Sequence, residues 1–154
     1  MSGADFLYPF LEGNERDAAT LLDDLTRSAR AKAEASAALA AATLDQLDGA
    51  LDAAASAMAE RFAAGGRLFT FGNGGSATDA LGLAGLFRDP PWGPGLPGKA
   101  LVEDTAVLTA LGNDVGFELV FSRQLIAHGR QGDIALGVST SGNSENLIVA
   151  FGEA

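Results

Sequence analysis

The chain contains no cysteine. That absence excludes disulfides, thiolate metal sites and cysteine nucleophiles together. Histidine is also scarce: the single one, His128, lies near the end of a predicted helix, where a positive charge complements the helix dipole, and we favour that role over catalysis. No apolar run is long enough to span a bilayer. The first residues also lack the basic region followed by an apolar run that marks a signal peptide. We therefore expect a cytoplasmic protein.

Basic residues are few, with 10 Lys and Arg against 20 Asp and Glu, and the formal net charge is -10. They are scattered between Arg16 and Arg130 without forming a cluster. A field of this sign repels phosphate backbones and anionic lipid surfaces. We expect neither nucleic acid nor membrane as a partner, and interpret the acidic side chains as a solvated face.

A hydrophobic fraction of 47% in 154 residues is ample for the core of one domain. Residues 1–64 are predicted to form an N-terminal helical segment, with helices near 16–42 and 44–62, because the stretch from residue 14 has no Pro and a single interior Gly. The first helix has a small-residue face that would gain most from packing against another subunit, so we expect this segment to serve oligomerisation.

The pattern changes after Gly65-Gly66, and residues 65–154 read as an α/β domain. The apolar periods predict strands at 67–71, 99–102 and 133–138. They predict helices at 77–87, 105–111, 115–128 and from Ser144 onward, with a proline-rich loop at 89–98. Strands that alternate with helices form parallel sheets, which bind ligands at the carboxyl ends of their strands.

One such end carries an unusual density of hydroxyl groups. The turn that follows the strand ending at Val138 contains Ser139, Thr140, Ser141, Gly142, Asn143 and Ser144. Hydroxyls, free backbone N–H groups and the dipole of the following helix would together favour a phosphate. The alternative is that these residues only cap the helix. One cap needs one such residue, so we favour the phosphate interpretation.

A glycine turn occupies the equivalent place after the first strand, and runs Gly72, Asn73, Gly74, Gly75, Ser76. It lacks the G-x-G-x-x-G spacing and the Walker lysine, so it gives no support for dinucleotide or P-loop nucleotide binding. Asn73 and Ser76 are candidates for hydrogen bonds to sugar hydroxyls. A tight connection without any ligand is an equal alternative.

Three segments, taken in order and spacing, resemble the phosphoheptose isomerases of the sugar isomerase (SIS) family. They are residues 71–77, 111–123 and 132–144. The resemblance implies a flavodoxin-like parallel-sheet fold, a homotetramer and a phosphorylated sugar, a heptose or ketose phosphate such as sedoheptulose 7-phosphate, as the ligand. It implies that Ser139, Thr140, Ser141 and Ser144 hold the phosphate, that Asn73, Gly74 and Gly75 line the sugar, and that Asn113 and Asp114 contact its hydroxyls.

The same resemblance reveals departures. Leu86 stands where the family carries its catalytic Glu, and Gly82 stands where some members carry a zinc-binding His. Neither residue moves a proton or binds a metal, so we expect no zinc or other cofactor. Asp79 and Asp89 are the nearest carboxylates. The family's acid, a His, and its last strands and covering helix would lie beyond Ala154, so we expect a truncated SIS domain with an exposed sheet edge.

Three functions remain open at this point. The first is phosphosugar binding without isomerase chemistry, which accepts Leu86 and Gly82 as they stand and which we favour. The second is an active isomerase with a displaced base, converting sedoheptulose 7-phosphate to D-glycero-D-manno-heptose 7-phosphate. The third is a protein-interaction scaffold that resembles the SIS protein associated with the bacterial replication initiator, for which the sequence offers no identifiable partner patch.

Overall fold

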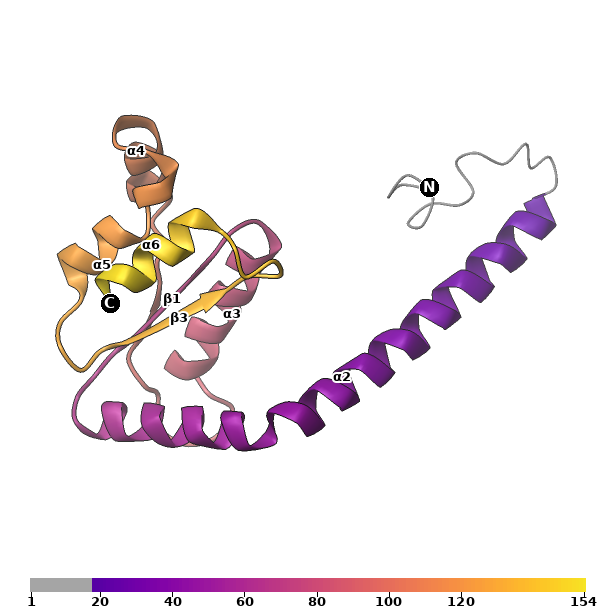
Figure 1. Ribbon diagram of the computed structural model, residues 1–154, viewed down its shortest axis with the longest axis horizontal. Coiled ribbons are helices and arrows are strands. Elements are labelled where there is room, and N and C mark those ends of the chain that lie inside the picture. The colour runs from indigo at the N-terminus through magenta and orange to yellow at the C-terminus, as the bar shows by residue number, and fades with distance from the viewer. Residues whose placement is uncertain (1–17) are drawn as a thin grey trace. The chain divides into compact units, whose positions relative to one another are not determined.

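A computed structural model describes residues 18–154 of the chain (Figure 1). Its internal contacts divide it into two compact units, and the boundary falls between Asp52 and Ala53. Within the described residues, no helix has both the length and the apolar character that crossing a membrane requires.

The first described element is one long helix, α2, which spans Ala18–Ala63. The prediction of two helices at 16–42 and 44–62 is therefore wrong for the described residues, and residues 16 and 17 lie outside them. The residue at the predicted break is Thr43, which a helix tolerates and whose hydroxyl donates to the carbonyl of Leu39 in the preceding turn; no Pro interrupts this stretch, so the helix continues. Several of its leucines are exposed in the single chain, among them Leu22, Leu39 and Leu44.

Three parallel strands form the sheet, in the order β2-β1-β3. β1 spans Leu68–Gly72, β2 spans Gly98–Ala100 and β3 spans Ile134–Val138. The central strand β1 is buried along its whole length, whereas β3 is half-buried and, in the described part of the chain, pairs only with β1. This arrangement confirms the predicted parallel α/β fold.

Helices follow the strands as the alternation predicts. They are α3 (Gly75–Arg88), α4 (Thr105–Asp114), α5 (Ser122–His128) and α6 (Glu145–Glu153), with a 3-10 turn, η2, at Phe117–Leu119. The single helix predicted at 115–128 is wrong. Gly116 has φ of 135°, which lies outside helical conformation, so the chain turns there and resumes as η2 and α5.

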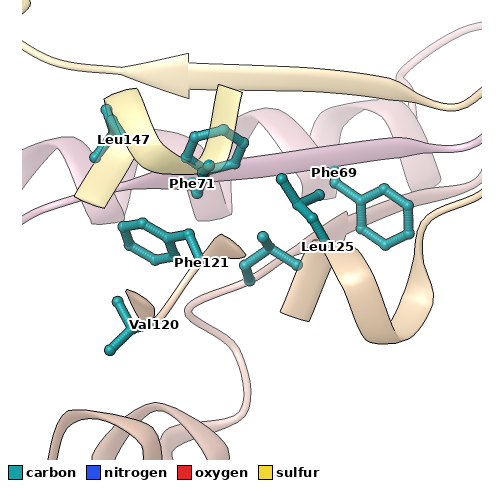
Figure 2. Close-up of a cluster of buried hydrophobic side chains, with 8 residues drawn as sticks. Phe69, Phe71, Val120, Phe121, Leu125 and Leu147 are labelled. Atoms are coloured by element: carbon teal, nitrogen blue, oxygen red, sulfur yellow. The ribbon is translucent and has the colours of Figure 1, made fainter. Parts of the chain in front are cut away.

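Alternate residues of β1 point to opposite faces of the sheet. Phe69 and Phe71 enter the main hydrophobic cluster, which Figure 2 shows, together with residues of α5, of α6 and of the short link between η2 and α5. Those partners include Val120, Phe121, Leu125 and Leu147. On the other face, the buried Thr70 hydroxyl donates a 2.7 Å hydrogen bond to the carbonyl of Ala80 in α3. The sheet is therefore covered by helices on both faces.

An ion pair joins the beginnings of β1 and β3. The guanidinium of Arg67 donates to both carboxylate oxygens of Asp133, at 3.2 Å from Nε and 2.6 Å from Nη2. The backbone N–H groups of Arg67 and Arg130 donate to the same carboxylate at 2.8 and 3.0 Å. Burial by itself raises the pKa of Asp133, but these hydrogen bonds outweigh it and hold the pKa below its ordinary value of 3.8.

This ion pair predicts a specific dependence of stability on pH. Since the pKa of Asp133 is lower in the folded than in the unfolded state, its contribution is present above about pH 4 and is lost as pH falls through the folded value. Asp133→Asn should therefore lower the free energy of unfolding by about 2 kcal/mol at neutral pH. The loss should shrink toward pH 3, measured by urea denaturation across that range. Parallel pH profiles for the two proteins would contradict the assignment.

Candidate functional site

The register of the sheet places the two predicted ligand turns side by side. Gly72, the last residue of β1, lies opposite Val138, the last residue of β3, so the glycine turn and the hydroxyl-rich turn begin at the same sheet edge. The approach is too close for a side chain at Gly72. A Cβ there would lie 2.6 Å from the carbonyl oxygen of Ser76 and 2.9 Å from that of Val138.

Three hydroxyls lie close together in the hydroxyl-rich turn. The Ser139 Oγ atom lies 3.4 Å from the Oγ atoms of both Ser141 and Ser144. Ser139 and Ser141 also accept hydrogen bonds from the backbone N–H groups of Gly142 and Asn143, at 3.1 and 3.2 Å. Gly142 has φ of 65°, a left-handed conformation that glycine adopts without strain. The turn is therefore organised by its own hydroxyls.

The amino terminus of α6 lies directly beside this cluster. Ser144 occupies the N-cap position, yet its side chain makes no capping hydrogen bond. Its hydroxyl contacts Ser139 instead. The Ser144 side chain therefore does not cap the helix. The free N–H groups and dipole of α6 remain directed toward an anion placed at the turn.

A reciprocal amide pair joins the glycine turn to the first turn of α6, directly after the hydroxyl-rich turn. The Asn73 side chain donates to Asn146 Oδ1 at 2.8 Å, and the Asn146 side chain donates back to Asn73 Oδ1 at 3.0 Å. Asn146 is only 3% exposed, so these bonds satisfy groups that have little access to water. Each amide keeps one N–H and one lone pair beyond the pair. Asn73 is thus held by Asn146 and is still able to contact a ligand.

Two cavities adjoin this pair and share Asn73 and Phe117 in their linings. The polar one, of about 300 Å³, is completed by Glu118, Ser144, Glu145 and Asn146. The other, of about 260 Å³, is largely apolar and lies between the glycine turn and residues of α3, α4 and η2. Among the described residues, no Lys or Arg lines either cavity.

The remaining predicted site residues fall in different places. Gly74 lines the apolar cavity, whereas Gly75 and Ser76 form the first turn of α3. Asn113 and Asp114 end α4, where the Asn113 amide donates to the Asp114 carboxylate at 2.6 Å. Neither of these two residues lines either cavity. Their contact with sugar hydroxyls stays a prediction, as does the role of Thr140.

Leu86 lies toward the carboxyl end of α3 and is half-exposed. It lines a separate apolar cavity of about 420 Å³ together with Phe87, Trp92 and three prolines of the loop that follows α3. Gly82, one turn earlier, has no atom within 4 Å of where its Cβ would lie. In residues 18–154, no three acidic or His side chains are grouped closely enough to hold a metal ion.

Comparison with known proteins identifies the family. A model of the SIS domain matches residues 33–154. The chain belongs to the SIS domain family. Phosphoheptose isomerase of Burkholderia pseudomallei strain 1710b is 46% identical over 134 residues, which cover 85% of this chain and 68% of the relative. The phosphoheptose isomerase of Aneurinibacillus thermoaerophilus is 53% identical over 89 residues, 56% of this chain and 45% of the relative.

Solved structures of the same family share the fold. Phosphoheptose isomerase GmhA from Neisseria gonorrhoeae superimposes with a TM-score of 0.67 at 39% identity, covering 87% of this chain and 66% of that one. A phosphoheptose isomerase from Francisella tularensis gives a TM-score of 0.75 at 34% identity, covering 86% and 68%. This SIS domain therefore spans about two thirds of the length of these two structures.

Sequence reasoning missed four residues of this SIS site. The polar cavity is also lined by Phe117, Glu118, Glu145 and Asn146. Asn146 was hidden because its partner lies 73 positions away in the chain. A signal did exist for Glu118, because it lies two residues after Gly116 within a segment of family resemblance, where a glycine can break the predicted helix.

The close approach of the two turns predicts different effects for two glycines. Gly72→Ala should destabilise the fold by about 1–3 kcal/mol, because its Cβ would meet backbone oxygens that have no room to move. Gly82→Ala, in the open interior of α3, should be neutral or stabilising by up to about 1 kcal/mol. Thermal unfolding of both variants measures this, and equal stabilities would refute the packing argument.

The amide pair predicts coupling between the two turns. Asn73→Ala and Asn146→Ala should each destabilise the protein, and the double variant should lose about 1 kcal/mol less than the sum, because the second change removes an already broken interaction. Urea denaturation of the four proteins gives the coupling energy. Strict additivity would show that the pair contributes nothing to stability.

Proposed function

We propose that this SIS domain binds a phosphorylated sugar, with the phosphate at the turn formed by residues 139–144. The observation that carries the proposal is the cluster of the three hydroxyls of Ser139, Ser141 and Ser144 beside the uncapped start of α6. Hydroxyl donors and helix N–H groups supply hydrogen bonds to phosphate oxygens without needing a cationic side chain. The sugar then extends over Asn73 into the adjoining cavities.

The names of the relatives support a class of sugar. Proteins 46% and 53% identical to parts of this chain are named phosphoheptose isomerases, which supports a heptose or ketose phosphate as the ligand. The two cavities, of about 300 and 260 Å³, together offer both hydrogen-bonding groups and an apolar wall for a polyhydroxylated chain. This proposal does not require isomerase chemistry at Leu86, whose side chain has no group that transfers protons.

The proposal extends to assembly and compartment. We infer a cytoplasmic homo-oligomer, a tetramer by the family resemblance, that uses α2 for association. Leu22, Leu39 and Leu44 are each at least 60% exposed in the single chain, and contact with a second copy would remove this apolar surface from water.

Loss of hydroxyls tests the phosphate site. Ser139→Ala combined with Ser141→Ala should weaken binding of sedoheptulose 7-phosphate by about a hundredfold or more, because each hydrogen bond to a charged oxygen contributes about 1.5–3 kcal/mol. Titration followed by NMR chemical shifts measures the affinity, and circular dichroism checks the fold.

The matched control is Thr109→Ala, which removes an exposed hydroxyl on α4 that bonds only the backbone of its own helix. Its affinity should equal that of the unaltered protein. Full affinity in the double Ser variant would reject the phosphate site.

A further inference from the structure

The buried face of α6 contains one amide among apolar side chains. Asn146 is 3% exposed, and the other buried side chains of this helix are Leu147 and Ala150. Within residues 18–154, the Asn146 side chain makes two hydrogen bonds, and both join it to Asn73. Two apolar side chains of matching shape could join the same segments without removing any polar group from water. The use of amides on both sides of this contact therefore needs a further reason.

The two amides differ in their access to the cavities. Asn73 is half-buried and lines both the polar and the apolar cavity. Asn146 lines only the polar one, and its low exposure leaves little of its surface for a ligand. Asn73 is therefore the amide that a ligand reaches, and Asn146 supports it from the interior.

The reciprocal bonds restrict the Asn73 side chain in a specific way. Its Nδ2 atom donates to Asn146 Oδ1 at 2.8 Å, and its Oδ1 atom accepts from Asn146 Nδ2 at 3.0 Å. Rotation of either amide about its terminal bond would break both hydrogen bonds at once. The N–H and the lone pair that Asn73 keeps are thereby oriented before any ligand binds. A ligand then meets a side chain whose rotational freedom has already been lost.

An amide edge oriented in this way favours a hydroxyl over a phosphate oxygen. A sugar hydroxyl both donates and accepts hydrogen bonds, so it can use the N–H and the lone pair that Asn73 keeps. An oxygen of a phosphate dianion only accepts, and the Asn73 lone pair would repel it. The amide pair therefore suits the sugar part of a ligand rather than its phosphate.

We propose that Asn146 is a positioning residue, which raises the affinity of this site for the sugar part of its ligand by holding the amide of Asn73 in place. This inference rests on the proposed phosphosugar function and adds to it a residue that does not itself need to touch the ligand. Since Asn146 acts through Asn73, its loss should matter only while Asn73 is present.

A double-mutant cycle of binding tests this, with the full chain, sedoheptulose 7-phosphate as the probe and titration followed by NMR. Asn146→Ala should weaken binding about tenfold, because the ligand itself must then order Asn73. In an Asn73→Ala background, the same change should weaken binding less than about twofold. Equal effects of Asn146→Ala in the two backgrounds would overturn the inference, as would the absence of any effect in the unaltered background.

Inorganic phosphate separates positioning from a general disturbance of the hydroxyl-rich turn. It has no sugar to meet Asn73, so its affinity should change less than about twofold in Asn146→Ala. A loss of phosphate affinity equal to the loss for the sugar phosphate would show that the turn itself had been damaged, and would overturn the inference.

The matched control is Gln124→Ala. Gln124 is also an amide that is 3% exposed, it donates to the carbonyls of Leu101 and Val120, and it lines neither cavity. Its loss should lower stability while leaving the affinity for sedoheptulose 7-phosphate unchanged. If circular dichroism shows that Asn146→Ala does not fold, Asn146→Ser replaces it in the cycle, because its hydroxyl still offers one hydrogen bond and the same pattern is expected.

The failure of this inference differs from the failure of the proposed function. Binding by the unaltered protein with an additive cycle would overturn the role of Asn146 alone. Absence of binding by the unaltered protein would overturn the proposed function and this inference together.

Discussion

The parallel pairing of β1 with β3 is the constraint on which the rest of the site depends. It runs in register from Leu68 opposite Ile134 to Gly72 opposite Val138, so two turns more than sixty positions apart leave the sheet together. A glycine at position 72 is needed for that approach, since a Cβ would collide with backbone oxygens on both sides. The amide pair of Asn73 and Asn146 then fixes the turns to each other within the next few residues. The site is a consequence of sheet register rather than of either turn alone.

The charge distribution explains how an acidic chain can present an anion site. The repulsion of an anion by the formal net charge of -10 is a long-range effect, and salt at ordinary ionic strength screens it beyond about 10 Å. Hydroxyls and helix N–H groups act only at hydrogen-bond distance, where their fixed orientation matters more than the average field. The ion pair lies at the opposite end of the same strands, where the Arg67 guanidinium donates to Asp133 and to the carbonyl of His128. The proposed binding of phosphate by neutral groups would therefore leave the stabilising ion pair undisturbed.

Much of the fold could be predicted from sequence because its signals are local. A continuous apolar run gave the buried strand β1, and glycine- and serine-rich turns gave the ends of β1 and β3. The failures have physical causes. The break predicted between residues 42 and 44 has no helix-excluding residue to cause it, whereas Gly116, placed inside a predicted helix, adopts a conformation that helices exclude. Ser139 and Ser144 stood out as hydroxyls in one short segment, while the Asn73 to Asn146 contact depends on strand pairing that no local pattern contains.

The position of Leu86 separates ligand binding from proton transfer, two functions that the family resemblance links. Leu86 lines an apolar cavity with Trp92 and the loop after α3, and this cavity shares no lining residue with the two cavities at the ends of β1 and β3. Within one chain, a Leu in place of a Glu at position 86 therefore alters a cavity other than the one beside the hydroxyl cluster. A ligand site at Ser139 and Ser144 can persist whatever occupies position 86. Any proton transfer at such a ligand, within a single chain, would need a group that lines the same cavities, and Leu86 lines neither of them.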